Sequence, residues 1–259
     1  MILRSLFAVS SALLMTSATA GAAQVAALIG GDTIAMVDTS QKKATGSVKV
    51  TGISGALVGI DVRPADGLLY GLVDDGTVVT IANDGKATMK SKLDTMIAKG
   101  VAVTVDFNPV ADRLRVMGAD GSNLRANVDD GKVTKDGDHK YADGDMHKGE
   151  KPNIVAGAYT NSAKGAKETA LFNIDGTIGG LIKQAPPNDG VLSAVGKLGI
   201  KPDAVAFDIW SDGNGRNEAW LMAGDALHSI DLATGKATEV AKITGVSGSV
   251  RDIAILPGG

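Results

Sequence analysis

The sequence predicts an all-β protein, a β-propeller of five blades whose last strand completes the first blade. Three observations lead to this prediction. Apolar strand segments recur at a regular interval, Asp-Gly pairs separate short runs of Val, Ile, Leu and Thr, and one strand segment stands alone at the C-terminus. The 34 glycines among 259 residues are about twice the usual share, and the turns account for them.

Five strand segments, each combining apolar residues with a small, polar or acidic one, recur along the chain. They begin at Val58, Val103, Val155, Val205 and Val250, at intervals of 45, 52, 50 and 45 residues. In the first, second and fourth units, this first segment is followed by a second strand, a hairpin and a third strand, and then by a Gly-Lys turn and a further strand. The third unit follows this order less closely. Four short strands in about 40–50 residues are typical of a propeller blade.

The fifth segment, residues 250–256, has no further strand after it. Residues 25–29 and 32–38, with a turn at 39–45, repeat the second and third strands of a unit. We therefore expect the C-terminal strand to become the inner strand of a blade that the N-terminus begins, which removes exposed sheet edges. A β-sandwich or barrel with coincidental spacing is the alternative.

Helical patterns are scarce. The best candidate is residues 91–100, where Leu93, Met96 and Ile97 have helical spacing and Gly100 could end the helix. We expect one short helix there and β-structure elsewhere.

Residues 1–22 have the pattern of a signal peptide, and residues 23–259 form a single propeller domain. Arg4 precedes an apolar stretch at residues 6–20 that is too short to span a bilayer, and Ala20-Gly21-Ala22 fits the small-x-small cleavage pattern. Cleavage near Ala18-Thr19-Ala20 and an uncleaved anchor are the alternatives. The mature chain is expected to be exported to the periplasm or the extracellular space, without a membrane span.

Composition and motifs exclude several classes of protein. The 26 basic and 29 acidic residues give a net charge of −3, which argues against a nucleic-acid partner. The absence of cysteine excludes disulfides, thiolate nucleophiles and iron–sulfur clusters. The sequence contains no nucleophile elbow, Walker A motif or dinucleotide fingerprint, and its three histidines lack zinc-site spacing. The sequence therefore favours a protein without enzymatic activity.

The segment FNPVADRLRV at residues 107–116, followed by GSNLRAN at 121–127, resembles the secreted bacterial domain-of-unknown-function family 4394. Further segments agree with this resemblance: GIDVRP at 59–64, YADGD at 141–145, AYTN at 158–161 and PPNDGVL at 186–192. The resemblance extends over residues 34–255. It implies export and a propeller-like β-fold, and it brings no activity.

The densest polar cluster lies in the second repeat unit. Asp106 and Asn108 share one strand face, as do Arg113 and Arg115, so arginine forks could bind a carboxylate or a sulfated sugar at a channel mouth. Aspartates at related positions of other blades could line the channel or cap turns. The alternative is structural: Asp–Arg pairs between strands, and Asn side chains bonded to turn backbone. The candidate ligand-binding residues are Asp61, Asp106, Asn108, Arg113, Arg125 and Asp208, with Asp252 at a related position.

No cofactor is expected, although Ca²⁺ is considered at two places. The acidic insertion at residues 136–150, with His139 and His147, offers oxygen ligands but lacks the spacing of an EF-hand loop, so a solvated loop is the favoured interpretation. The aspartates of the strand segments could also place oxygen ligands around a cation in the channel.

Three functional hypotheses follow. The leading one is a non-catalytic exported propeller that binds a small molecule, a glycan or a protein at one face. The second is a Ca²⁺-assisted hydrolase or lactonase, and the third is a structural component of the envelope or matrix. Metal content after dialysis would separate the second hypothesis from the others.

Overall fold

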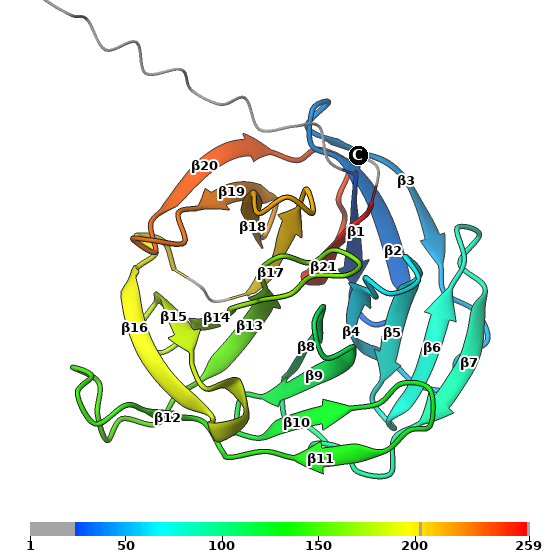
Figure 1. Cartoon of the computed structure of the whole chain (residues 1–259). Coiled ribbons are helices and arrows are strands. Elements are labelled where there is room, and N and C mark those ends of the chain that lie inside the picture. The colour runs from blue at the N-terminus through cyan, green and yellow to red at the C-terminus, as the bar shows by residue number, and fades with distance from the viewer. Residues whose placement is uncertain (1–23, 202–203, 258–259) are drawn as a thin grey trace, which may run out of the picture.

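The computed structural model describes residues 24–201 and 204–257, which form a five-bladed β-propeller (Figure 1). Each blade is one β-sheet, and the five sheets stand around a central axis. The predicted fold class is therefore confirmed. The innermost strands of blades 1 to 5 are, in order, β21 (Val250–Ile255), β4 (Leu57–Val62), β8 (Val103–Asn108), β13 (Ile154–Tyr159) and β17 (Val205–Ser211).

The other strands follow outward within each blade. Blade 1 adds β1 (Gln24–Ile29), β2 (Thr33–Asp38) and β3 (Lys43–Lys49). Blade 2 adds β5 (Leu69–Val73), β6 (Thr77–Ile81) and β7 (Ala87–Lys92). Blade 3 adds β9 (Arg113–Gly118), β10 (Asn123–Ala126) and β11 (Val133–Lys135). Blade 4 adds β14 (Leu171–Asp175), β15 (Gly180–Gln184), β16 (Val191–Lys197) and, at its outer edge, β12 (Lys140–Tyr141). Blade 5 adds β18 (Asn217–Ala223), β19 (Ala226–Ile230) and β20 (Ala237–Lys242).

Asp-Gly pairs lie in many of the hairpin turns within the blades, as the sequence predicts. Between β5 and β6, Gly76 has a φ of 86°, and the Asp75 carboxylate accepts the N–H of Thr77 at 2.8 Å. In this Asp-Gly dipeptide, glycine adopts the left-handed backbone conformation that it enters freely, and the short aspartate side chain caps the turn. Blade 4 departs from the pattern because β12, which precedes β13 in the chain, pairs parallel to β16.

The C-terminal strand closes the ring in the way the sequence predicts. Strand β21 pairs antiparallel with β1, so that Val25 lies opposite Ile255 and Ala27 opposite Ile253. The N–H of Leu256 donates to the carbonyl of Gln24 at 2.9 Å. Blade 1 is thus built from both ends of the described chain, and none of the five innermost positions lacks a strand.

Apolar side chains fill the five interfaces between neighbouring blades. One hydrophobic cluster lies at each interface, such as the cluster of blades 2 and 3, in which Tyr70 and Phe107 meet edge to face with ring centroids 5.2 Å apart. Because every blade has two neighbours, both faces of its sheet are covered. All six residues of β4 are buried for this reason, and the strand reads as apolar almost throughout.

The helix predicted at residues 91–100 is wrong. Residues 87–92 form β7, and the chain that follows is a loop. Its backbone bonds to distant turns instead of to itself: the N–H of Leu93 donates to the carbonyl of Gly76, and that of Asp94 to Gly131. Leu93 and Ile97 are still buried, but in the interface of blades 2 and 3, so their spacing reflects packing and not helix formation.

The proposed signal peptide, residues 1–22, lies outside the described residues. Within residues 24–201 and 204–257, no helix is long and apolar enough to cross a membrane.

Closure of blade 1 is testable by truncation. Removal of residues 250–259 should unfold or aggregate the protein, because β1 would lose its partner and the cluster of blades 1 and 5 would lose Ile253 and Ile255. Size-exclusion chromatography and thermal melting of the mature chain measure this, with a chain ending at Pro257 as the control. A truncated monomer that melts at the control temperature would show that closure does not stabilise the fold.

Candidate cation site and channel mouth

The edge of each inner strand that is unpaired within its sheet needs hydrogen-bond partners for its backbone. Buried aspartate carboxylates of blades 1, 2, 3 and 5 accept backbone N–H groups from the inner strand of the next blade. These cross-blade bonds, at 2.6 to 2.9 Å, run from Phe107 to Asp61, from Tyr159 to Asp106, from Ile255 to Asp208 and from Ile60 to Asp252. The aspartates therefore link neighbouring blades at the axis.

Three of these aspartates stand in one layer of the channel. Each of these carboxylates accepts an N–H from the next blade, and the donor residue comes directly after the position equivalent to the aspartate. These bonds therefore show which residues of neighbouring inner strands lie at the same level. It places Asp61, Asp106 and Asp208 level with one another, and it places Ala158 and Ala254 at the same level in the two other blades. The layer thus has three carboxylates and two methyl groups.

Asp252 lies two residues before this layer on β21. Its carboxylate accepts the N–H of Ile253 at 3.0 Å and that of Ile60 at 2.9 Å. Gly59 leaves room for it, because a Cβ atom at Gly59 would lie 3.0 Å from Asp252 Oδ2 and 2.6 Å from Val105 Cγ2. Burial raises the pKa of Asp252 well above its ordinary value. A fourth carboxylate therefore occupies the next layer of the channel.

One carboxylate oxygen from each of Asp61, Asp106 and Asp208 lies within 4.8 Å of the other two, and all three residues are buried. Burial, followed by the charge of a neighbouring aspartate, holds the pKa values of Asp61 and Asp106 well above 3.8. Burial also raises the pKa of Asp208 to about 6, against the opposing effect of the N–H groups of Ile255 and Ile209. The triad, as we call these three aspartates, is costly to ionise unless positive charge is nearby.

The donor set and spacing of the triad fit a hard divalent cation. In an equilateral triangle with sides of 4.8 Å, the centre lies roughly 2.8 Å from each corner, and a smaller triangle brings it closer. Ca²⁺ binds oxygen ligands at about 2.3–2.6 Å, whereas zinc sites usually include nitrogen or sulfur ligands. Carboxylates that already accept backbone N–H groups are also fixed in orientation. The triad could therefore hold Ca²⁺ with three protein ligands and leave further positions open.

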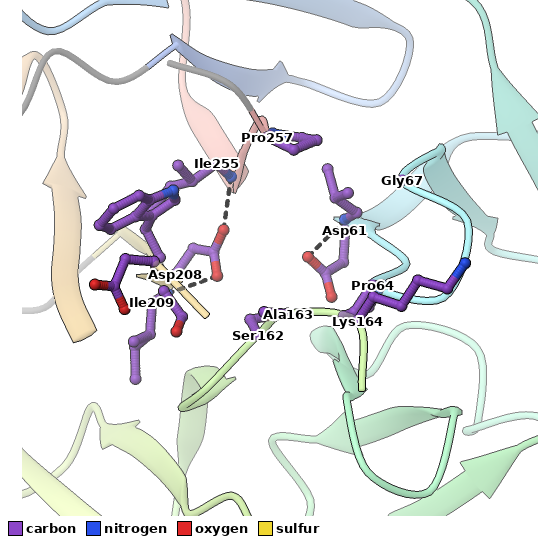
Figure 2. A pocket seen from close by; sticks show the side chains of 14 residues that line it. Asp61, Pro64, Gly67, Ser162, Ala163, Lys164, Asp208, Ile209, Ile255 and Pro257 are labelled. Atoms are coloured by element: carbon purple, nitrogen blue, oxygen red, sulfur yellow. Dashed lines mark hydrogen bonds between the residues drawn. The ribbon is translucent and has the colours of Figure 1, made fainter. Parts of the chain in front are cut away.

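A cavity of about 390 Å³ opens onto two members of the triad, Asp61 and Asp208, at the end of the channel where the inner strands finish. Figure 2 shows Asp61 and Asp208 on opposite sides of it, with the loop of Ser162, Ala163 and Lys164 crossing between them. The Lys164 side chain reaches toward Gly67 and not toward the two carboxylates. The other lining residues are Val62, Pro64, Ile209, Trp210, Ser211, Asp212, Ile255 and Pro257.

The wall of this cavity could not be recognised from the sequence. Trp210 and Ser211 are the last residues of β17, and Ser162 to Lys164 belong to the long loop after β13. Asn161 and Asn217 fix this loop: the N–H of Asn161 donates to Asn217 Oδ1 at 2.7 Å, and Asn217 Nδ2 donates to Asn161 Oδ1 at 2.9 Å. The only sequence signal was the position of these residues directly after a predicted inner strand.

Asn108 and Arg113 do not join the triad. The Asn108 side chain accepts the N–H groups of Val110 and Ala111 at 2.9 and 2.8 Å and so caps the turn after β8. The Arg113 guanidinium donates to the carbonyl oxygens of Ala111 and Asp112 in the same turn. Asn108 therefore has the turn-backbone contact that the structural alternative described, whereas Arg113 bonds to turn carbonyls and not to the carboxylate which that alternative expected.

Arg125 is paired with a carboxylate of its own chain. Its Nε and Nη2 donate to the two oxygens of Asp136 at 2.6 and 2.9 Å. Arg115, which is almost fully buried, donates to the same Asp136 and also to Tyr159 Oη and Asn188 Oδ1. This network joins blade 3 to blade 4, and Arg115 is its centre.

The acidic insertion at residues 136–150 contains packed polar contacts. The Asp145 carboxylate accepts the N–H groups of His147 and Ala194, and His147 Nδ1 lies 3.1 Å from Glu150 Oε2. His139 is buried, and desolvation, followed by the charge of Arg115, lowers its pKa to about 4. Among the residues that the structure describes, the group of acidic or histidine side chains placed to share an ion is the triad.

The model of the family described as "Domain of unknown function (DUF4394)" matches residues 33–254 of the chain. No curated protein matches the chain significantly.

Solved structures share the fold at low sequence identity. A calcium-binding protein, regucalcin, from Agrobacterium tumefaciens superposes with a TM-score of 0.50 at 14% identity, covering 91% of this chain and 82% of that one. A protein of unknown function from Bacteroides thetaiotaomicron also gives 0.50, at 16% identity, over 81% of this chain and 54% of that one. At these identities the similarity is one of fold.

The contrast between Arg115 and Arg113 gives a stability prediction. Replacement of Arg115 by Ala should lower the free energy of unfolding by about 2 kcal/mol or more, because buried Asn123 and Tyr159 would lose a donor and Asp136 would keep only Arg125. Arg113→Ala should change it by less than about 0.5 kcal/mol, because its bonds are local. Urea unfolding of both variants measures the difference. Equal effects of the two substitutions would contradict this account of the network.

His139 predicts a pH dependence. Its pKa is about 4 in the folded protein and 6.5 ordinarily, so between these values the unfolded chain binds more protons. This residue should therefore reduce stability as pH falls from 6.5 to 4, by up to about 3 kcal/mol. His139→Leu should remove that part of the slope, as measured by urea unfolding across this range. A constant stability difference between wild type and variant at all pH values would contradict the prediction.

Proposed function

The chain belongs to the DUF4394 family, whose description assigns no activity, and we propose that it is a cation-dependent ligand-binding propeller. In this proposal Ca²⁺ binds to the triad, and a small oxygen-bearing molecule binds in the cavity above it. The observation that carries the proposal is the convergence of three buried carboxylates, two of which line an open cavity, with backbone amides as their hydrogen-bond donors.

Charge is the first argument for a cation. Three carboxylates so close together repel one another, and their backbone N–H donors supply only partial positive charge. A bound Ca²⁺ would neutralise most of this charge and offer its remaining coordination positions to ligand oxygens. The chain's own part is to hold the three carboxylates in fixed orientation and to shape the cavity.

The comparison with regucalcin supports the proposal in a limited way. It is a calcium-binding protein with a similar fold, so a fold of this kind is compatible with Ca²⁺ binding. The argument for this chain still rests on Asp61, Asp106 and Asp208.

Export is part of the proposal. Residues 1–22 have a signal-peptide pattern, and extracellular modules commonly bind Ca²⁺ with dissociation constants of about 10⁻⁴–10⁻³ M. A site with only three protein carboxylates suits such a modest affinity. We therefore propose that the mature chain acts outside the cytoplasm.

Hydrolysis is the second candidate function, and the open cavity is the observation that favours it. Asp61 and Asp208 face a space that water can enter, and Ser162, Ser211 and Asp212 also line it. Turnover of simple esters or lactones by the Ca²⁺-loaded protein, lost in Asp208→Asn, would establish this candidate. It would replace the non-catalytic proposal.

Calcium titration of the metal-free mature chain tests the proposed function. Isothermal titration calorimetry should show one Ca²⁺ per chain, and saturating Ca²⁺ should raise the melting temperature, since binding to the folded state stabilises it. Asp208→Asn should weaken binding by about tenfold or more, because it removes a charged ligand.

Asp252→Asn is the matched control. It removes the same kind of cross-blade carboxylate, but from the layer outside the triad. It should cost similar stability while leaving Ca²⁺ affinity within about threefold of wild type. Failure of the wild-type protein to bind Ca²⁺ at millimolar concentration, or equal affinities of the two variants, would overturn the proposal.

A further inference from the structure

A second cavity continues from the one above the triad. It has a volume of about 510 Å³ and lies between blades 1 and 2. Gly67 and Pro257 line both cavities, so the two spaces meet at these residues. Figure 2 shows both of them on the side of the channel mouth that faces the blue and cyan strands of blades 1 and 2. We call this second cavity the apolar groove.

The side chains that line the apolar groove are almost all apolar, although backbone polar groups also face it. Blade 1 contributes side chains from β2 and β3, and blade 2 contributes side chains from β5, β6 and the loop before β5. The lining residues are Ile34, Met36, Val48, Gly67, Leu68, Leu69, Ile81, Ala82, Asn83, Leu256 and Pro257. Asn83 is the one polar side chain in this set, and none of the set is charged.

The apolar groove opens the core between blades 1 and 2 to solvent. Met36, Val48, Leu69 and Leu256 pack against that core cluster but are only partly buried. Leu68, at the rim, is 51% exposed. An apolar surface left open beside a polar cavity has the form of a ligand site for a molecule with two kinds of surface.

We propose that the protein binds a single-chain amphiphile, with its oxygen-bearing head above the triad and its hydrocarbon chain in the apolar groove. This inference rests on the proposed function, because the bound cation would hold the head. The two cavities border each other at Gly67, and a Cβ atom there would have nothing within 4 Å, so this residue leaves space beside both. Each cavity lies within the usual range for small-molecule sites, about 300–1,000 Å³.

The charge of the site selects the head group. Three ionised carboxylates around one divalent cation leave a net negative charge, which repels a carboxylate head. A neutral head with carbonyl or hydroxyl oxygens can bind the cation without that repulsion. The ligand class is therefore a neutral acylated molecule, such as an acyl ester or an acyl lactone, and not a free fatty acid.

A chain-length series tests the inference. Monoacylglycerols with chains of four, six, eight and ten carbons are titrated into the Ca²⁺-loaded wild-type protein below their micelle concentrations. Affinity should rise by about fourfold for each added methylene that the apolar groove buries. Fatty acids of equal length should bind more weakly, and EGTA should weaken monoacylglycerol binding. Affinity independent of chain length, or unaffected by EGTA, would overturn the inference.

The Leu68→Gln variant tests whether the hydrocarbon chain binds in the apolar groove, and Val110→Gln is its matched control. Both residues are exposed apolar residues, 51% and 48%, in the loop after an inner strand, but only Leu68 lines the apolar groove. Leu68→Gln should flatten the chain-length series, while Val110→Gln should leave it unchanged. Equal behaviour of the two variants would overturn the placement of the chain.

Calcium titration without amphiphile separates the two proposals. If the wild-type protein binds Ca²⁺ but its affinity for monoacylglycerols does not depend on chain length, the amphiphile inference fails and the proposed function stands. If it binds no Ca²⁺, the proposed function fails, and the inference that rests on it fails with it.

Discussion

Unpaired backbone on the inner strands is the constraint on which the centre of this propeller depends. A strand at the axis has a sheet neighbour on one side only, so the N–H groups of its other edge need acceptors from elsewhere. Aspartate solves this locally, because one short carboxylate accepts an N–H from its own strand and another from the next blade, as Asp61 and Asp208 do. The hydrogen bonds that join the blades therefore gather negative charge on the axis.

The protein treats buried charge in two different ways. At the interface of blades 3 and 4, the carboxylate of Asp136 faces the guanidinium groups of Arg115 and Arg125, so the charges are paired within the chain. On the axis, Asp61 and Asp208 face other carboxylates and an open cavity. In the first arrangement the negative charge is balanced by arginines of the same chain. In the second, we propose that a cation from solution balances it. This difference separates a structural cluster from a candidate site, although both consist of buried acidic residues.

Departures from five-fold repetition lie in blade 4 and between blades 1 and 2. Blade 4 has Ala158 at the position of the aspartates, an added edge strand and the long loop that crosses the cavity. The gap between blades 1 and 2 is not filled at its rim, which leaves Met36 and Leu256 partly exposed in the apolar groove. A repeated scaffold thus provides rigid walls, and its irregular parts give the channel mouth its shape and chemistry.

The sequence by itself determined the repeated hairpins, the number of blades and the closure by residues 250–256, because these follow from local turn chemistry and from a period that a single chain displays. It also named Asp61, Asp106 and Asp208 as candidates, but it grouped Asp61 and Asp208 with Asp252, which the structure places two residues before their layer. It misplaced a helix at residues 91–100, because apolar spacing records burial without saying whether the backbone bonds to itself or to distant turns. Only the tertiary structure decided that the three aspartates meet, that Arg125 is bound to Asp136, and that Gly67 and Pro257 join two cavities. Those facts depend on which strands stand opposite one another after the ring closes, and alternation along one strand gives a side chain's face but not its partner.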